Sequence, residues 1–111
     1  MERKFLLLSE RSKNEVLNYM PNESSISKLA LFFQNFSDGT RLKIISCLAM
    51  CDMCVNDIST ILDVNQTTIS HQLKYLKSQN IVSCKRDGKI ILYSLTSSKV
   101  NDLMLSAVNV V

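Results

Sequence analysis

The sequence lacks long hydrophobic runs, and this absence argues against a membrane-spanning helix. None of its apolar stretches approaches the roughly 20 consecutive apolar residues that a helix needs to cross a bilayer. The stretch from Phe5 to Leu8 follows two basic residues but is too short for the core of a signal peptide. We therefore expect a cytoplasmic protein that does not interact with a membrane.

Glycine, proline and cysteine are also scarce, with two, one and four residues in a chain of 111. Together with a hydrophobic content of 46%, this composition is typical of a globular, helix-rich protein. A chain of this length is expected to form one domain with a modest core. In the cytoplasm its cysteines are expected to be reduced, so a disulfide framework is not expected.

Patterns that indicate catalysis are missing as well. The sequence contains no glycine-rich phosphate loop, no pairing of histidine with a carboxylate and no nucleophile with a nearby base. Cys51 and Cys54 form a C-x-x-C pair, which a thiol-disulfide enzyme would place after a strand in a βαβ unit. The preceding segment is helical in pattern, so we do not expect an enzyme.

The chain is predicted to consist of an N-terminal arm, residues 1–23, and a single domain, residues 24–111. The arm is polar and weakly patterned, with at most a short helix near residues 14–19. The domain is expected to begin with a helix that is capped by Ser24 or Ser25 and runs to about Phe36. Its predicted inner stripe consists of Ile26, Leu29, Ala30 and Phe33. Further apolar residues lie off this stripe, which suggests burial against a second chain.

A helix-turn-helix is predicted in the middle of the chain. Asp38 is a suitable cap for a helix over residues 40–49, whose inward positions are predicted to be Leu42, Ile45, Leu48 and Ala49. A short helix over residues 55–62 and a three-residue turn lead into a helix over residues 66–79. The last helix has Ile69, Leu73 and Leu76 on one face and begins with many short polar side chains. Such a polar start is typical of a helix that contacts DNA.

After Asn80 the hydrophobic period changes from helical to alternating, and Asp87-Gly88 interrupts it. This pattern predicts a β-hairpin. Residues 64–95 carry five basic residues against Asp87 alone, which favours a polyanionic partner for this half of the chain. An apolar stripe over residues 96–111 predicts a final helix that serves in dimerisation. The predicted fold is therefore mainly α with a two-stranded β-wing, a winged helix-turn-helix that dimerises through its N- and C-terminal helices.

Four segments together carry a resemblance to the ArsR/SmtB family of bacterial repressors. They read FSDGTRLKII, DMCVNDI, TTISHQLKYLKSQNIV and KRDGKIILYSL, and the similarity extends over roughly residues 29–95. The sequence most resembles the cadmium- and zinc-responsive branches of the family, although Gly39 stands where the family usually has proline. The resemblance implies a homodimer that binds an inverted repeat in double-stranded DNA and leaves it when an inducer binds.

This function assigns roles to particular side chains. Base contacts are expected from the start of the recognition helix, and phosphate contacts are expected mainly from basic residues. The candidate DNA-binding residues are Gln66, Thr67, Thr68, Ser70, His71, Lys74, Lys85, Arg86 and Lys89. For Thr67 and Thr68, capping of the helix is the alternative role.

The inducer site that the resemblance implies is only partly present. Cys54 matches the first cysteine of the family's C-V-C motif, whereas Asn56 replaces the second, and residues 1–46 contain no cysteine. Cys51 forms a C-x-x-C pair with Cys54, and Cys47 lies one helical turn earlier. Three thiolates suit thiophilic ions, so these cysteines predict an arsenite, antimonite, cadmium or lead site. The family's zinc site on the C-terminal helix is absent, because no histidine follows His71.

Other interpretations of the cysteines remain open. Oxidation of the thiols would make the protein a redox-responsive repressor of the same fold. Cys47 and Cys84 are also suited to packing in the core, in which case the cysteines sense nothing. A protein-interaction module without DNA binding is the remaining alternative, but it would have no need for a polar recognition helix together with a basic wing.

Overall fold

The structure is a computed structural model that describes residues 7–111. It separates two units, one ending at Leu31 and the other extending from Phe32 to Val111. The first six residues of the predicted arm lie outside the described residues. Whether residues 1–23 act as an arm beside a domain of residues 24–111 stays a prediction.

The first unit contains α1 (Glu10–Tyr19) and most of α2 (Glu23–Gln34). Asn22 caps α2, because its Oδ1 accepts a hydrogen bond from the Ser25 backbone N–H at 2.8 Å. The predicted cap at Ser24 or Ser25 is therefore wrong. Neither helix contains a buried residue, so the side chains of this unit obtain little stabilisation from burial within it.

The last turn of α2 and the residues after it belong to the second unit, and here the predicted inner stripe is wrong. Phe32 and Phe36 pack against the core of this unit, whereas Phe33 is 49% exposed. The helix is apolar on several sides, and this distribution of phenylalanines explains why its sequence did not reveal which face is inward.

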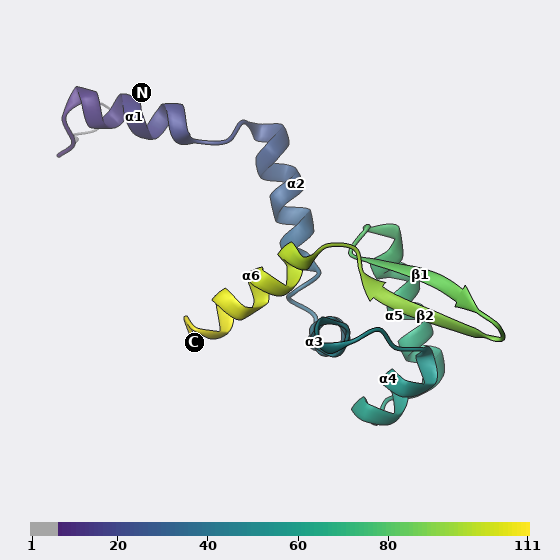
Figure 1. Cartoon of the computed structure of the whole chain (residues 1–111). Coiled ribbons are helices and arrows are strands. Elements are labelled where there is room, and N and C mark those ends of the chain that lie inside the picture. Colours follow the sequence, from purple (N-terminus) through teal and green to yellow (C-terminus); the bar gives the residue numbers. More distant parts are fainter. Residues whose placement is uncertain (1–6) are drawn as a thin grey trace. The chain divides into compact units, whose positions relative to one another are not determined.

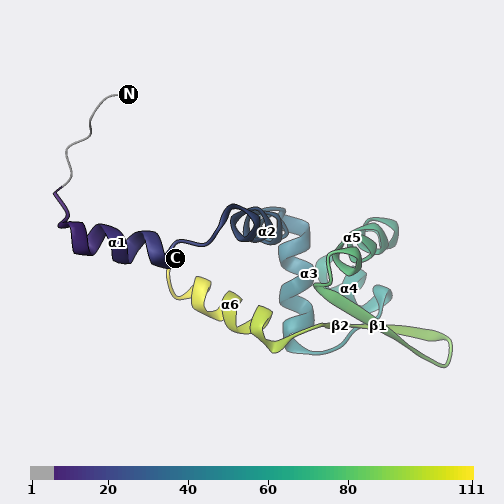
Figure 2. The same cartoon turned by 90° about the horizontal axis from the view of Figure 1, so that it is seen from above.

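The second unit has the element order of a winged helix-turn-helix, which confirms the predicted fold. It consists of α3 (Gly39–Met50), α4 (Val55–Leu62), α5 (Gln66–Ser78), β1 (Val82–Asp87), β2 (Ile90–Leu95) and α6 (Ser98–Val108). Helices α4 and α5 pack together, and the β1–β2 hairpin projects beyond the helices (Figures 1 and 2). Among residues 7–111, no helix combines the length and apolar character needed to cross a bilayer.

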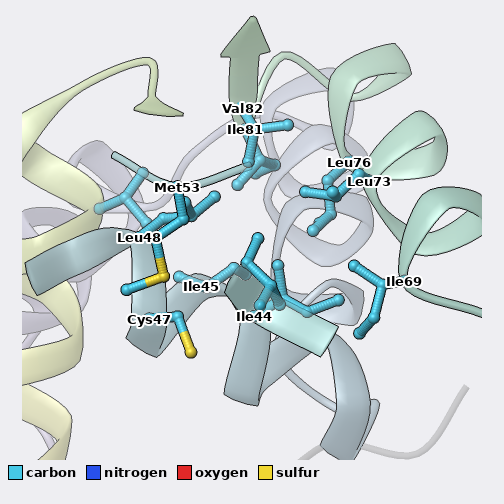
Figure 3. Close-up of a cluster of buried hydrophobic side chains, with 12 residues drawn as sticks. Ile44, Ile45, Cys47, Leu48, Met53, Ile69, Leu73, Leu76, Ile81 and Val82 are labelled. Carbon is cyan, nitrogen blue, oxygen red and sulfur yellow. The ribbon is translucent and has the colours of Figure 1, made fainter. Parts of the chain in front are cut away.

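The core joins one face of α3 to α4, α5 and the first residues of the hairpin (Figure 3). Its fully enclosed side chains are Ile44, Ile45, Ile58, Ile69, Leu73, Leu76, Ile81 and Val82. Asp38 caps α3 as predicted, by accepting the Arg41 N–H at 2.9 Å. The inward orientation predicted for Leu42 is wrong, since its side chain is 37% exposed, and Ala49 is only half-buried.

The hairpin is antiparallel and pairs Val82 with Leu95 at its base and Asp87 with Ile90 at its tip. Gly88 has φ +64°, a left-handed conformation that glycine adopts without steric cost. Met53, between α3 and α4, forms two backbone hydrogen bonds with Tyr93 of β2, at 3.1 and 2.8 Å. The segment that carries the cysteines is therefore tied directly to the wing.

Candidate nucleic-acid interface and cysteine sites

Helix α5 has two clearly different faces. Ile69, Leu73 and Leu76 are 0% exposed and hold the helix against the core. The predicted contacts Gln66, Thr67, Thr68, Ser70, His71 and Lys74 are all exposed. The burial of one face thus leaves the polar side chains of the other available to a partner.

The N-terminus of α5 is capped by Asn65, whose Oδ1 accepts the Thr67 N–H at 2.7 Å. The side chains of Thr67 and Thr68 are therefore not needed for the cap, which was their alternative role. The turn before Asn65 depends on Asp63, which has φ +54°, and on Ser59, whose Oγ donates to the Val64 carbonyl at 2.5 Å. These contacts set the direction in which the recognition helix begins.

A hydrogen bond links the first residue of α5 to α4. Gln66 Nε2 donates to Asn56 Oδ1 at 2.9 Å. Asn56 stands at the position where the resemblance has a second cysteine, and here it orients a candidate base-contacting side chain. The sequence indicated Asn56 only as a missing ligand. Asn56 and Gln66 are ten residues apart and lie on different helices, so their contact leaves no periodic pattern in the sequence.

Arg41 is a second residue whose role the sequence reasoning missed. Its guanidinium lies over the ring of Tyr75 of α5, 4.4 Å from the ring centroid. A cation over an aromatic face is attracted by the ring, so Arg41 connects the start of α3 to the recognition helix. The segment FSDGTRLKII was the available sequence signal for Arg41, since it contains this residue and Asp38, which caps α3.

The wing places three basic side chains near its tip. Lys85, Arg86 and Lys89 are all exposed, and Arg86 Nε donates to the Gly88 carbonyl at 3.1 Å. This bond holds the guanidinium close to the turn. A projecting tip of this charge suits contact with phosphates.

The three clustered cysteines occupy different environments. Cys51 is exposed and ends α3, whereas Cys54 is half-buried and caps α4. The Cys54 N–H donates to the Asp57 carboxylate at 3.4 Å. A depression of about 360 Å³ is lined by Cys51, Asp52, Met53, Asn56, Asp57, Thr60 and Ile61. Cys51, Asp52 and Asp57 thus line the same depression.

Cys47 lies in the core and is 9% exposed. Burial raises the pKa of its thiol above the ordinary value of 9.0, and the neighbouring Cys51 adds to this rise. Cys47 lines a second groove, and Cys51 is not among the residues that line it. Within residues 7–111, no three histidine, cysteine or acidic side chains are grouped so as to hold a metal ion.

Cys84 is separate from the other three. It is half-buried on β1 and lies opposite Tyr93 of β2. This position fits the packing role that the sequence suggested for Cys84.

Comparison with known proteins reveals clear relatives. Residues 38–83 match the model of a family described as bacterial regulatory protein, arsR family. A transcriptional repressor SmtB homolog from Synechocystis sp. is 37% identical over 76 residues, which are 68% of this chain and 58% of that protein. The chain therefore spans less than two thirds of that relative.

Two further matches cover more of both chains. The cadmium resistance transcriptional regulatory protein CadC of Listeria innocua is 37% identical over 89% of this chain and 80% of its own length. A solved homodimeric winged helix-turn-helix DNA-binding domain from Mycobacterium bovis has a TM-score of 0.72 at 25% identity. It matches 96% of this chain and 89% of that one.

Proposed function

This chain belongs to the ArsR family of bacterial regulatory proteins, and we infer from this and from its geometry that it represses transcription as a DNA-bound homodimer. Its family consists of regulators rather than enzymes, as the sequence indicated. We propose release from DNA by a soft metal or metalloid ion bound to cysteine thiolates. Such a regulator acts where the bacterial DNA lies, in the cytoplasm.

The two-faced helix α5 is the observation that carries the DNA-binding proposal. Its start presents Gln66, Thr67, Ser70 and His71 as side chains that can donate to or accept from base edges. Thr68 and Lys74 would contact phosphates beside it, together with the three basic side chains of the wing. Base contacts would set the sequence preference, and phosphate contacts would supply most of the affinity.

The proposed dimer rests on apolar side chains that one chain leaves exposed. A groove of about 370 Å³ in the second unit is lined by Phe33, Phe36, Leu42, Ser46, Leu103, Met104, Ala107, Val108 and Val111. A hydrophobic surface of this kind marks an interface in a protein of this size. A homodimer would match the two halves of an inverted repeat, because protein and operator would share a twofold axis.

For the inducer we propose Cys51 and Cys54 as the ligands, whereas Cys47, the third ligand expected from the sequence, lines a different groove. Two relatives are named as a cadmium resistance regulator and as an arsenical resistance repressor, and these names support a soft ion as the inducer. Cys51 ends α3 and Cys54 is the N-cap of α4, so one short connection between the two helices carries both sulfur atoms. A soft ion would be coordinated strongly by thiolate sulfur. The protein would supply the connection to DNA, since Asn56 of the same helix holds Gln66.

The test uses the reduced full-length protein and a labelled fragment of its own promoter region. Fluorescence anisotropy would report DNA affinity while cadmium, arsenite, zinc or peroxide is added. We expect cadmium or arsenite to weaken DNA binding, and Cys54→Ser to remove most of this response. Cys84→Ser is the matched control and should respond like the wild type.

Each arm of the experiment bears on a different part of the proposal. If wild type and Cys54→Ser respond alike, the thiolate site at Cys54 is wrong. Release by peroxide alone would establish the redox alternative. If the protein does not bind the promoter fragment, repression at that site is refuted.

A further inference from the structure

Two methionines share the segment that carries the clustered cysteines, so five sulfur-containing residues fall between positions 47 and 54. Cys47, Met50 and Met53 line a groove of about 570 Å³, together with Leu42, Lys43, Ser46, Ile61 and Leu62. Figure 3 shows the sulfur atoms of Cys47 and Met53 on the side of the core away from Leu73 and Leu76. One thiol and two thioethers therefore line the same apolar groove.

We propose that this groove is a binding site for a monovalent soft cation, namely Cu(I), with Ag(I) as a redox-inert analogue. Thiolate and thioether sulfur are ligands that select Cu(I). The charge of the donor set points to the same ion. One thiolate and two neutral thioethers neutralise a single positive charge, whereas a divalent ion would retain a net charge in surroundings that are mostly apolar.

The charged residue of the groove strengthens this selection. Lys43 contributes a positive charge at the same groove, which opposes a complex with a net positive charge. Asp52 and Asp57, which would favour a divalent ion, line the neighbouring depression with Cys51. The residues that line the groove of Cys47 include no carboxylate, so this groove suits a monovalent ion.

The three sulfur residues also differ in exposure in a way that suits ion capture. Cys47 and Met53 are buried and held by the core, while Met50 is 83% exposed. An unbranched methionine side chain adapts easily to a new contact, so Met50 can close over an ion held by the other two. On binding, the Cys47 thiol loses its proton to solvent and the thiolate coordinates the ion.

An ion in this groove would lie beside α4 and beside the residue that is hydrogen-bonded to the wing. Ile61 and Leu62 belong to α4, the first helix of the helix-turn-helix, and Met53 is bonded to Tyr93 of β2. The site does not include Cys51 or Cys54. It therefore goes beyond the proposed function and can hold or fail independently of the inducer site there.

The test isolates Cys47 as the only thiol by the combined substitutions Cys51→Ser, Cys54→Ser and Cys84→Ser. Under anaerobic conditions, competition with a chromogenic Cu(I) chelator would give the Cu(I) affinity, and X-ray absorption would identify the ligand atoms. We expect one Cu(I) bound per chain by sulfur ligands. Met50→Leu and Met53→Leu should each weaken binding by at least about tenfold, as expected for altered metal surroundings.

Met20→Leu in the same background is the matched control and should leave the affinity unchanged, since Met20 lies outside the groove. Because Met53 is buried, circular dichroism would check the fold of its variant, and the exposed Met50 provides an independent test. Unchanged Cu(I) affinity in both methionine variants would overturn the proposal. So would full affinity in Cys47→Ala, or a ligand shell without the sulfur of methionine.

Discussion

At the scale of single residues, Asn56 is informative because it replaces a sulfur ligand and gains a structural contact. Its amide oxygen accepts from Gln66 at the start of the recognition helix. A cysteine at this position could not accept a comparable hydrogen bond, since its sulfur is a weak acceptor. We infer that this chain has exchanged one metal ligand for control over the orientation of Gln66.

This interpretation predicts an energetic coupling between Asn56 and Gln66 in operator binding. Asn56→Ala should lower operator affinity only while Gln66 is present, because the hydrogen bond needs both side chains. For a bond of this type we expect a coupling energy of about 1 kcal/mol. A double-mutant cycle with Asn56→Ala and Gln66→Ala, measured by anisotropy, gives this value. Simple additivity within roughly 0.5 kcal/mol would show that the two residues act separately.

Cys47 leads to a second prediction, on the pH dependence of stability. Its pKa is raised in the folded protein, mainly by burial and to a smaller extent by Cys51. The folded state therefore keeps a proton that the unfolded state loses near pH 9.0, the ordinary value. Stability from this group is complete below that pH and falls as the pH rises toward the folded pKa.

The measurement is urea unfolding of the wild type and Cys47→Ala at neutral pH and near pH 10. The free energy of unfolding should fall more between the two pH values in the wild type than in the variant. The comparison between proteins cancels the titration of lysines and tyrosines, which both share. If the free energy of unfolding has the same pH dependence in both proteins, Cys47 ionises equally easily in the folded and the unfolded state.

At the scale of elements, the wing depends on the backbone conformation of its tip. Gly88 has φ +64°, with open space around its Cα. An alanine there meets no neighbour, but it must adopt a left-handed conformation that costs about 1–2 kcal/mol. Gly88→Ala should therefore reduce the free energy of unfolding by about this amount.

Gly39 is the matched control for the wing. It also has open space around its Cα, but it begins α3 and lacks a positive φ. Gly39→Ala should leave stability unchanged or raise it slightly, since alanine loses less conformational freedom on folding. Thermal unfolding of both variants would check the pair. A smaller loss for Gly88→Ala than for Gly39→Ala would contradict the conformational argument.

The elements differ in how well the sequence predicted them, and local signals explain the difference. Asp38 as a cap, the inward row from Ile69 to Leu76 and the turn at Gly88 each follow from a few adjacent residues, and all three were predicted correctly. The inward face of α2 was predicted wrongly, because its apolar residues surround the helix. Contacts such as Arg41 with Tyr75 join distant segments, so only the folded chain reveals them.

The candidate sites show the same limit. The exposed face of α5 could be predicted, since exposure follows directly from the buried row on the opposite side. The interruption of the helix between residues 49 and 55 was also predicted. The separation of Cys47 from Cys51 into two depressions could not be, because it depends on the extended conformation of Cys51 in the folded chain. A helical wheel over residues 47–54 would place all three cysteines on one side. The interruption of the helix makes that projection invalid.

At the scale of the whole molecule, the amount of exposed apolar surface is the feature that a single chain does not explain. The described part of the first unit buries no side chain, and the second unit has an apolar groove lined by residues of α2, α3 and α6. Phe33 of this groove is about half exposed. Burial of such a surface against a second copy would contribute stability that the monomer lacks, so folding, dimerisation and DNA binding should be coupled.

A charge placed in this groove should therefore separate the subunits. We predict that Phe33→Glu, which leaves the core residues unchanged, shifts the mass in sedimentation equilibrium toward the 12.6 kDa of one chain. DNA affinity should fall in parallel and become strongly dependent on protein concentration, because two half-sites must then be bound by separate monomers. Ile61→Glu, an exposed apolar residue outside the groove, is the control and should remain dimeric. If Phe33→Glu keeps the mass of the wild type, the groove is not the interface, and the exposed surface of the first unit becomes the remaining candidate.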